Sequence, residues 1–319
     1  MATLGIDVGK SKLHAVMLHE DLAKAKIVAN SASGLEQLEE WLRSLGLERV
    51  HVCLEATGGW SEDIGAVLHR AGYVVSIVNP SRIKAFAQSE MLRTKTDRVD
   101  AAMIARFCQL HAPEPWSPPT PEAAALQGLV RRYENLVHMQ AEEQNRLQAP
   151  LVTTTVKRSI RATLNHLGRE LARVDREIKQ VFDRNPSLRS QRDLLTSIPG
   201  IGDTTAARIL GEMPRIAEFR SVKAVAAFAG LSPRHYLSGS IRWPSRLAKA
   251  GNANLRRSLY FPAITAIRFN PVIKRFADRL RARGKPKMSI IAAAMRKLLA
   301  LAYGVLKSGR AFDPVDMTA

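Results

Sequence analysis

The chain has 319 residues, a length typical of two domains and a connector, and 46% of them are hydrophobic, which excludes a disordered tail. Residues 189–310 hold 24 Lys and Arg against 5 Asp and Glu, whereas residues 1–188 hold 24 against 22. This basic block predicts a polyanionic partner, because each neutralised phosphate releases condensed counterions. Two cysteines, Cys53 and Cys108, exclude a disulfide framework. Because the sequence shows neither a signal peptide nor a long apolar run, we expect a cytoplasmic protein that contacts no membrane.

The first part of the chain alternates strand and helix patterns. Leu4, Ile6 and Val8 share one face of an opening strand, and later segments switch to helical spacing. The predicted order is three strands, helix, strand, helix, strand, helix, with strands at 3–9, 12–19, 25–29, 50–55 and 73–78 and helices at 34–45, 61–72 and 97–110. This order predicts an α/β domain over residues 1–115.

Four acids in this domain occupy unusual positions. Asp7 lies inside the first strand, where a charge is costly unless it is compensated, and Glu55 ends the fourth strand. Asp97 and Asp100 are three residues apart and therefore share one face of a helix. Carboxylates bind hard cations, and two ions about 4 Å apart can clamp both oxygens of a phosphoryl transfer. The four acids predict a site for Mg²⁺, as two ions, with Mn²⁺ as a substitute. The arrangement resembles the ribonuclease H-like fold of the RuvC type.

Residues 122–185 follow a Pro-rich linker and read as a helical connector. The second of its two helices carries an apolar residue at alternating spacings of four and three, which is a heptad seam. The members of this seam are Ile160, Leu164, Leu167, Leu171, Val174, Ile178 and Val181. We favour a dimerising coiled-coil hairpin, and the alternative is an amphipathic pair that packs on its own domain.

Residues 189–319 form a mainly helical, basic region that begins with a predicted helix–hairpin–helix. Its tight turn contains Gly200 and Gly202, which permit a phosphate to approach the backbone, and a helix starts directly afterwards. Such a hairpin binds the nucleic-acid backbone without reading sequence. A plain helical turn is the alternative.

A loop over residues 228–251 follows and is dense in basic side chains. Ser238 precedes Gly239 in it, and a serine in a positive field can attack a phosphodiester, although a Ser-Gly pair is more often a plain turn. The candidate phosphate contacts near this serine are Arg242, Arg246, Lys249 and Arg256.

Six motifs in their order resemble the IS110 family of transposases, including its IS1111 branch. They are GIDVGKSKLHAVML, LEATGGW, KTDRVDAAMIA, SIPGIGDTTAARIL, FAGLSPRHYLSGS and KAGNANLRRSL, and they span nearly the full chain. The resemblance places the four catalytic acids of the family on Asp7, Glu55, Asp97 and Asp100, and its catalytic serine on Ser238. Family members often have Ser-Gly-Gly, whereas here the third residue is Ser240, which leaves Ser240 as a second candidate nucleophile.

The resemblance implies a recombinase that mobilises an insertion sequence by cutting and rejoining donor and target DNA. The implied parts are a RuvC-like domain, a coiled-coil linker and a transposase domain. A site shared between subunits implies homodimers or homotetramers, and some members are guided by a structured non-coding RNA.

The residues alone predict a Mg²⁺-dependent phosphoryl transferase acting on nucleic acid, and they leave three alternatives. A RuvC-like endonuclease would hydrolyse DNA with water and would not need Ser238. A nucleic-acid-binding protein with a decayed site would bind equally well without Asp97. A helical interaction protein would show no salt-dependent affinity for nucleic acid.

Overall fold

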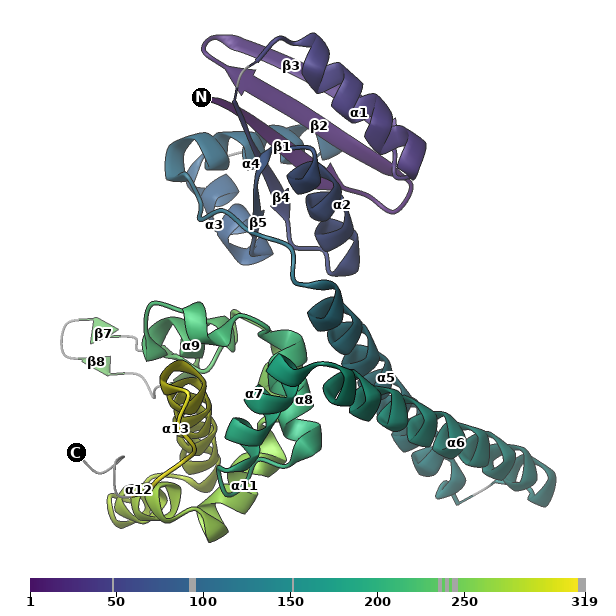
Figure 1. The fold of residues 1–319 in the computed structure, drawn as a ribbon, viewed down its shortest axis with the longest axis vertical. Helices are drawn as coiled ribbons and strands as arrows, with labels where there is room; N and C mark the ends of the chain where they lie inside the picture. The colour runs from purple at the N-terminus through teal and green to yellow at the C-terminus, as the bar shows by residue number, and fades with distance from the viewer. Residues whose placement is uncertain are drawn as a thin grey trace. The chain divides into compact units, whose positions relative to one another are not determined.

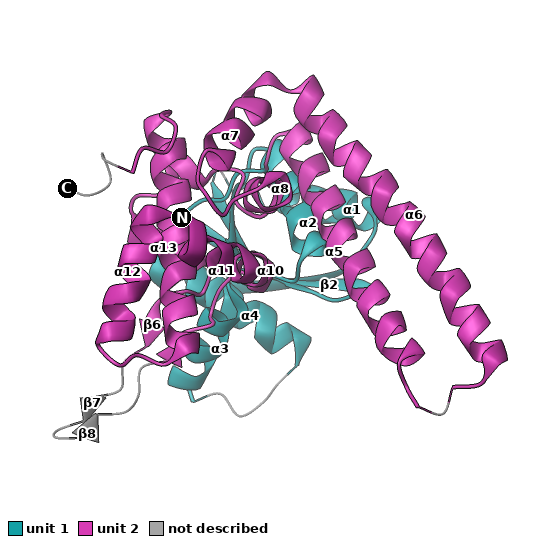
Figure 2. Cartoon of the chain, turned by 90° about the horizontal axis from the view of Figure 1, so that it is seen from below, with its two compact units in different colours: residues 1–118 teal, residues 119–319 magenta. Residues whose placement is uncertain are grey.

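The structure is a computed structural model in which the chain folds into two compact units. Unit 1 is Met1–Pro118 and unit 2 is Pro119–Ala319 (Figure 2). The structure describes residues 1–47, 49–91, 96–150, 152–234, 237–238, 241–242 and 246–314, with the backbone alone at 237–238 and 241–242.

Unit 1 is built on a five-stranded sheet in the order β3-β2-β1-β4-β5 (Figure 1). β2 pairs antiparallel with β1 and with β3, whereas β4 runs parallel to β1 and β5 runs parallel to β4. The strands are β1 (Ala2–Val8), β2 (Lys12–His19), β3 (Leu22–Ala29), β4 (Val50–Glu55) and β5 (Val74–Val78). The predicted α/β fold of this domain is confirmed, with the arrangement expected of a ribonuclease H-like domain.

Helices cover both faces of this sheet, and the alternation of side chains along the strands decides what each face packs against. Leu4 and Ile6 of β1 are fully buried in a core with α1 (Ala32–Ser44) and α2 (Gly59–Arg70). On the opposite face, Cys53 of β4 packs in a second core formed with α3 (Pro80–Ser89) and α4 (Asp97–His111).

α3 is absent from the sequence-based expectations, because Asn79-Pro80 reads as the end of a strand. In the structure the side chain of Asn79 accepts a hydrogen bond from the backbone N–H of Ser81 at 2.9 Å, and Pro80 opens the helix. The same two residues therefore end β5 and begin α3.

Unit 2 starts with two long helices, α5 (Pro121–Leu147) and α6 (Thr154–Arg184), which pack against each other (Figure 1). The predicted seam of α6 is turned toward its own chain: Leu167 and Val174 are buried in a core that also contains Leu136 of α5. This burial is what the amphipathic-pair alternative expects, so the seam alone requires no second subunit. Dimerisation through these helices stays a prediction.

The rest of unit 2 is mainly helical, as predicted. Its helices are α7 (Pro186–Thr196), α8 (Asp203–Glu212), η1 (Ile216–Glu218), α9 (Val222–Phe228), α10 (Ala253–Ser258), α11 (Tyr260–Phe269), α12 (Pro271–Ala282) and α13 (Lys287–Ser308). Leu126 and Val130 of α5 share one core with Ala207 and Leu210 of α8, so the helix pair and the C-terminal helices form one packed unit. The three-part division at 1–115, 122–185 and 189–319 stays a prediction.

α13 is, in the part of the chain that the structure describes, the one helix whose length and composition suit a membrane span. Of its most apolar stretch, 56% is buried within the protein. Leu298, Leu299 and Ala302 lie in the core of unit 2, which is the environment of a core helix.

Candidate functional site

Two of the predicted metal ligands are neighbours at the carboxyl ends of β1 and β4. Ile6 lies opposite Leu54 in the parallel pairing of these strands, so Asp7 and Glu55 are the next residues along each strand. Glu55 belongs to the face covered by α4, because Cys53, two residues earlier, packs there, and Asp7 belongs to the same face because Gly5, two residues earlier, contacts α4. The register of the sheet thus brings Asp7 and Glu55 together, each of them half-buried.

α4 carries the other two acids on its sheet-facing side. Ala101 and Ile104 are fully buried against the sheet, and Asp97 and Asp100 each lie four residues earlier on the same side. The helix sits directly on β1, since a Cβ at Gly5 would lie 2.2 Å from the carbonyl oxygen of Ala101. Only glycine permits this close approach.

A histidine that the sequence reasoning overlooked ties α4 to the end of the sheet. His14 of β2 lies directly opposite Asp7, and its Nε2 is 3.3 Å from Oδ2 of Asp97. Asp97 is therefore held at the sheet edge that carries Asp7, although its side chain is 68% exposed. The signal that could have revealed His14 is the strand pairing, which assigns opposite residues to one face.

The start of α4 suits two negative charges. Thr96 caps the helix by accepting a hydrogen bond from the backbone N–H of Val99 at 3.3 Å. Asp97 and Asp100 both lie in the first turn, where the partial positive charge of a helix N-terminus stabilises carboxylates.

The donor set at this edge fits a hard divalent cation, because its four predicted ligands are all carboxylates. Within the described residues, no three His, Cys, Asp or Glu side chains converge on one ion position. The fit therefore rests on the placement of Asp7, Glu55, Asp97 and Asp100 along one sheet edge rather than on a closed cage.

Beneath this edge, a hydrogen bond with Cys108, together with burial, raises the pKa of the Cys53 thiol.

The turn between α7 and α8 contains the two glycines predicted to contact phosphate. Gly200 has a φ of +107°, and a Cβ there would lie 2.7 Å from the Cβ of Ala266, so this glycine lets α11 pack against the turn. Gly202 faces open space, and α8 begins after it without a side-chain cap. Packing accounts for Gly200, whereas Gly202 has room for a ligand. Phosphate binding at this turn stays a prediction.

The two ends of the loop that carries the predicted nucleophile pair with each other. We call the pairing of these ends the stem: Pro233–Arg234 (β6) pairs antiparallel with Arg246–Leu247 (β9), and below it the N–H of Asn252 donates to the carbonyl of Phe228 at 2.6 Å. The chain thus leaves the core and returns to it at one place.

Beyond the stem, the backbone of Leu237–Ser238 (β7) pairs with that of Ile241–Arg242 (β8). The side chains of Ser238 and Arg242, and all of Ser240, lie outside the described residues. Their assigned roles stay predictions.

Three further predicted phosphate contacts lie at or below the stem. Arg246 and Lys249 are exposed. Nη1 of Arg256 donates to the carbonyls of Ala229 at 3.2 Å and Lys249 at 3.3 Å. Arg256 therefore joins the two sides of the loop base, a structural role beside the predicted phosphate contact.

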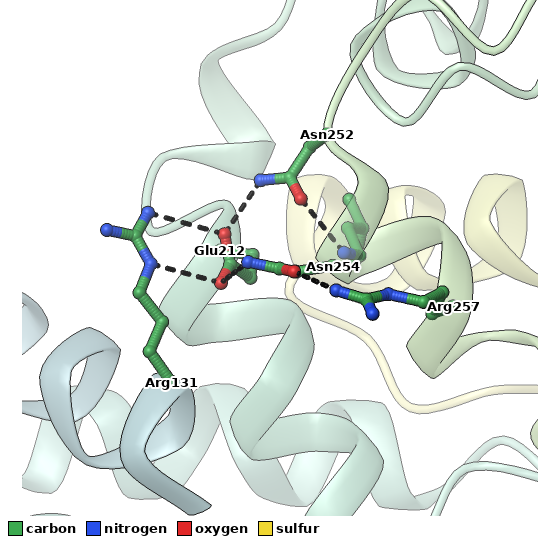
Figure 3. A network of polar contacts seen from close by, with 6 residues as sticks. Arg131, Glu212, Asn252, Asn254 and Arg257 are labelled. Carbon is green, nitrogen blue, oxygen red and sulfur yellow. Dashed lines mark hydrogen bonds and ion pairs between the residues drawn. The ribbon is translucent and has the colours of Figure 1, made fainter. Parts of the chain in front are cut away.

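Glu212, at the end of α8, gathers polar side chains from other segments of unit 2 (Figure 3). Its side chain is only 3% exposed. Arg131 of α5 donates to it from Nε at 3.2 Å and from Nη2 at 3.5 Å, and Asn252 donates from Nδ2 at 2.7 Å. Asn254 adds a contact from Nδ2 at 3.4 Å. The buried charge is thus matched by a guanidinium and two amides.

These contacts fix the start of α10 to α8. Oδ1 of Asn252 accepts from the backbone N–H of Leu255 at 2.9 Å and caps α10, while Arg257 donates to Oδ1 of Asn254 at 2.6 Å. α10 begins where the loop above the stem returns to the core, so Glu212 anchors that return. Sequence reasoning gave Glu212 no role, because a single acid in a helix looks like a surface residue.

Two family profiles match the chain. The profile of the IS110 DEDD transposases, described as a transposase, covers residues 4–156. The profile described as transposase IS116/IS110/IS902 family covers residues 192–278. The first contains the four acids at the sheet edge and Arg131, and the second contains the α7–α8 turn, the loop, Glu212, Asn252 and Asn254.

Curated relatives align along most of the chain. The pilin gene-inverting protein of Moraxella bovis is 33% identical over 97% of both chains, and its counterpart in Moraxella lacunata matches to the same extent. The transposase for insertion sequence element IS1328 of Yersinia enterocolitica is 23% identical over 80% of this chain and 81% of its own.

Among solved structures, Thermus thermophilus RuvC in complex with a Holliday junction substrate matches 36% of this chain and 99% of its own. The identity is 19% and the TM-score is 0.28.

Proposed function

The chain belongs to the IS110 family of transposases, and we propose that it cleaves and rejoins DNA with a metal-assisted acid site and a serine nucleophile. The observation that carries the proposal is the meeting of Asp7, Glu55 and the first turn of α4 at one sheet edge. Four carboxylates from three elements along one sheet edge suit metal-assisted phosphoryl transfer.

Asp7, Glu55, Asp97 and Asp100 would hold Mg²⁺, which when bound supplies positive charge at the attacking and leaving oxygens of a phosphodiester. Glu55 and Asp7 are fixed by strand pairing, and His14 orients Asp97 through the contact at 3.3 Å. The register of β1 and β4 would then set the positions of Asp7 and Glu55 before an ion binds.

Ser238 would act as the nucleophile. Its Oγ forms a bond to phosphorus, the bond from phosphorus to a deoxyribose oxygen breaks, and the departing oxygen takes up a proton as the serine loses one. A hydroxyl end of another DNA strand then attacks the phosphoserine, so that the strands are joined and the serine regains its proton. The basic loop around Ser238 supports this role, because positive charge stabilises the phosphorane-like transition state.

The partners follow from this chemistry. Donor and target DNA bind the basic surface of residues 189–310, and a structured guide RNA supplies target choice to a chain whose motifs include no sequence-reading module. A site shared between two copies in a homodimer or homotetramer is part of the proposal. The protein would act in the cytoplasm.

Inversion of a DNA segment is a second candidate outcome. Two pilin gene-inverting proteins match 97% of the chain at 33% identity, whereas the transposase of IS1328 matches at 23%. Inversion and transposition can use the same cutting and joining steps and differ in the arrangement of the recombining sites. Sequencing the junctions formed by the protein in a test plasmid would tell them apart.

Covalent trapping tests the chemistry. The purified protein, with its co-purifying RNA, is incubated with Mg²⁺ and the DNA that flanks its gene, and adducts are resolved on a denaturing gel for wild type, Ser238→Ala, Ser240→Ala and Asp97→Ala. An adduct that needs both Ser238 and Asp97 supports the proposal. An adduct lost only in Ser240→Ala moves the nucleophile to Ser240. Nicking without an adduct, lost only in Asp97→Ala, indicates a RuvC-like endonuclease that uses water.

A further inference from the structure

α11 presents an unusual outer face. Phe261, Thr265, Arg268 and Phe269 are spaced to share one side of the helix, and all four are exposed. Phe261 is 74% exposed and Phe269 is 70% exposed, more than any other described aromatic residue. Two such rings on one helix face, about 12 Å apart along its axis, form an apolar surface that the fold itself leaves uncovered.

The outer α11 face is held rigidly from behind. Ala263 and Ala266 are fully buried on the opposite side of the helix. The ring of Tyr260, which packs on the core, meets the ring of Phe261 edge-on with centroids 5.2 Å apart. A rigid aromatic surface loses little conformational entropy when a ligand binds to it.

The buried side of α11 packs against the α7–α8 turn. Gly200 approaches Ala266 so closely that a Cβ would be 2.7 Å away, and Nδ2 of Asn270 donates to the carbonyl of Pro199 at 3.3 Å. Asn270 follows Phe269 directly, so the Phe269 end of α11 is adjacent to the turn that contains Gly202. A strand with a phosphate at that turn would have its neighbouring bases within reach of α11.

The segments on either side of α11 in the sequence are strongly basic. Residues 253–287 contain ten Lys and Arg against one acid, Asp278, which pairs with Arg281. Nine of the ten basic side chains are exposed. This charge favours a polyanion and disfavours a second copy of the same surface.

We propose that the outer α11 face is a stacking platform for unpaired bases of a DNA strand whose backbone follows the basic surface beside the α7–α8 turn. Aromatic rings in a positive groove bind single strands because every base has a face that can stack. A duplex cannot use the rings, since its bases are already stacked on one another. The proposal rests on the proposed function in taking DNA as the substrate, and it concerns binding rather than chemistry.

Fluorescence anisotropy with a labelled oligothymidine, measured on the full-length protein in EDTA, tests the platform without any cleavage. We expect Phe269→Ala to weaken binding about tenfold and the double change with Phe261→Ala to weaken it further. Phe269→Leu should match the alanine variant, whereas Phe269→Trp should retain affinity, and the added tryptophan fluorescence should be quenched by the bound strand. Thr265→Ala, on the same face without a ring, is the matched control and should change nothing.

Salt dependence separates stacking from charge. Changes at Phe261 and Phe269 should leave the slope of log affinity against log salt unaltered, whereas Arg268→Ala should reduce it by about 0.7. Four binding results would overturn the proposal. They are an unchanged affinity of the phenylalanine variants for the oligothymidine, an equal loss of affinity of these variants for a duplex, a loss of affinity confined to RNA, and a retained affinity in Phe269→Leu. A fall in the mass of the protein by light scattering would also overturn it, since it would make the face an interface between copies. Because binding in EDTA needs no reaction, its failure is distinct from a failure of covalent trapping.

Discussion

The sheet edge of unit 1 and the loop base of unit 2 hold their polar side chains in different ways. In unit 1, strand register and the contact of Gly5 with α4 place the acids through the backbone. In unit 2, the buried charge of Glu212 collects side chains from other segments to anchor the returning loop. A site placed by backbone keeps its shape when one side chain is changed. A site placed by a buried charge depends on that charge.

The largest effect is expected from removing an acid at the sheet edge. Asp7→Asn or Asp97→Asn should lower DNA cleavage about a thousandfold, because several kcal/mol of transition-state stabilisation are lost, while folding is unchanged. Cleavage rates and circular dichroism measure the two properties. Asp21→Asn, in the exposed turn between β2 and β3, is the control. Cleavage at the wild-type rate without Asp97 would remove the metal-site assignment.

Glu212→Ala should act on stability instead. It leaves the guanidinium of Arg131 and two amides without their buried partner, which costs about 3–5 kcal/mol. Urea denaturation followed by hydrogen exchange should show the loss in unit 2 and normal protection in unit 1. Glu218→Ala, which breaks the exposed pair with Arg215, should cost at most about 1 kcal/mol. Equal losses in the two variants would contradict the anchoring role.

Gly5→Ala tests the backbone placement of unit 1. The added methyl group would meet the backbone of α4, so the helix must shift, at a cost of about 1–3 kcal/mol. Because Asp97 and Asp100 move with the helix, cleavage should fall as well. Gly128→Ala in α5, where the space around the added carbon is open, should instead stabilise by about 0.5–1 kcal/mol. A Gly5 variant with normal stability and activity would show that the close contact is dispensable.

The smallest effect concerns the thiol beneath the acids. The raised pKa of Cys53 keeps its thiol protonated at neutral pH, and its side chain is fully buried. Alkylation of Cys53 in the folded protein should therefore be slow at pH 7 and fast after unfolding, as measured by mass spectrometry. Rapid labelling of the native protein at this position would indicate that the edge opens readily.

Sequence patterns predicted more of the candidate site in unit 1 than of the contacts in unit 2, for a physical reason. Asp7 and Glu55 could be placed because strands have a fixed period and the parallel ends of neighbouring strands meet. Asp97 and Asp100 followed from helical spacing. His14 needed the pairing between β1 and β2, which is a contact between strands rather than a property of either strand.

Unit 2 depends on contacts that no local pattern encodes. Glu212 gains its importance from Arg131, which is 81 residues away. The heptad seam has the right spacing for a dimer, yet Leu167 and Val174 are buried within their own chain, because an apolar stripe does not specify which helix covers it. Gly200 could be recognised as a turn residue, but its contact with Ala266 could not.

The stem below Ser238 has a consequence for how such proteins diversify. Since β6 and β9 already hold the ends together, changing the number of residues between them costs little conformational entropy, about 0.6 kcal/mol for each doubling. Insertions and replacements there leave the core undisturbed. If Ser238 acts as proposed, the tip that carries it can be exchanged as a cassette, and grafting tips from relatives onto this stem would test whether the recombinase gains a different reach.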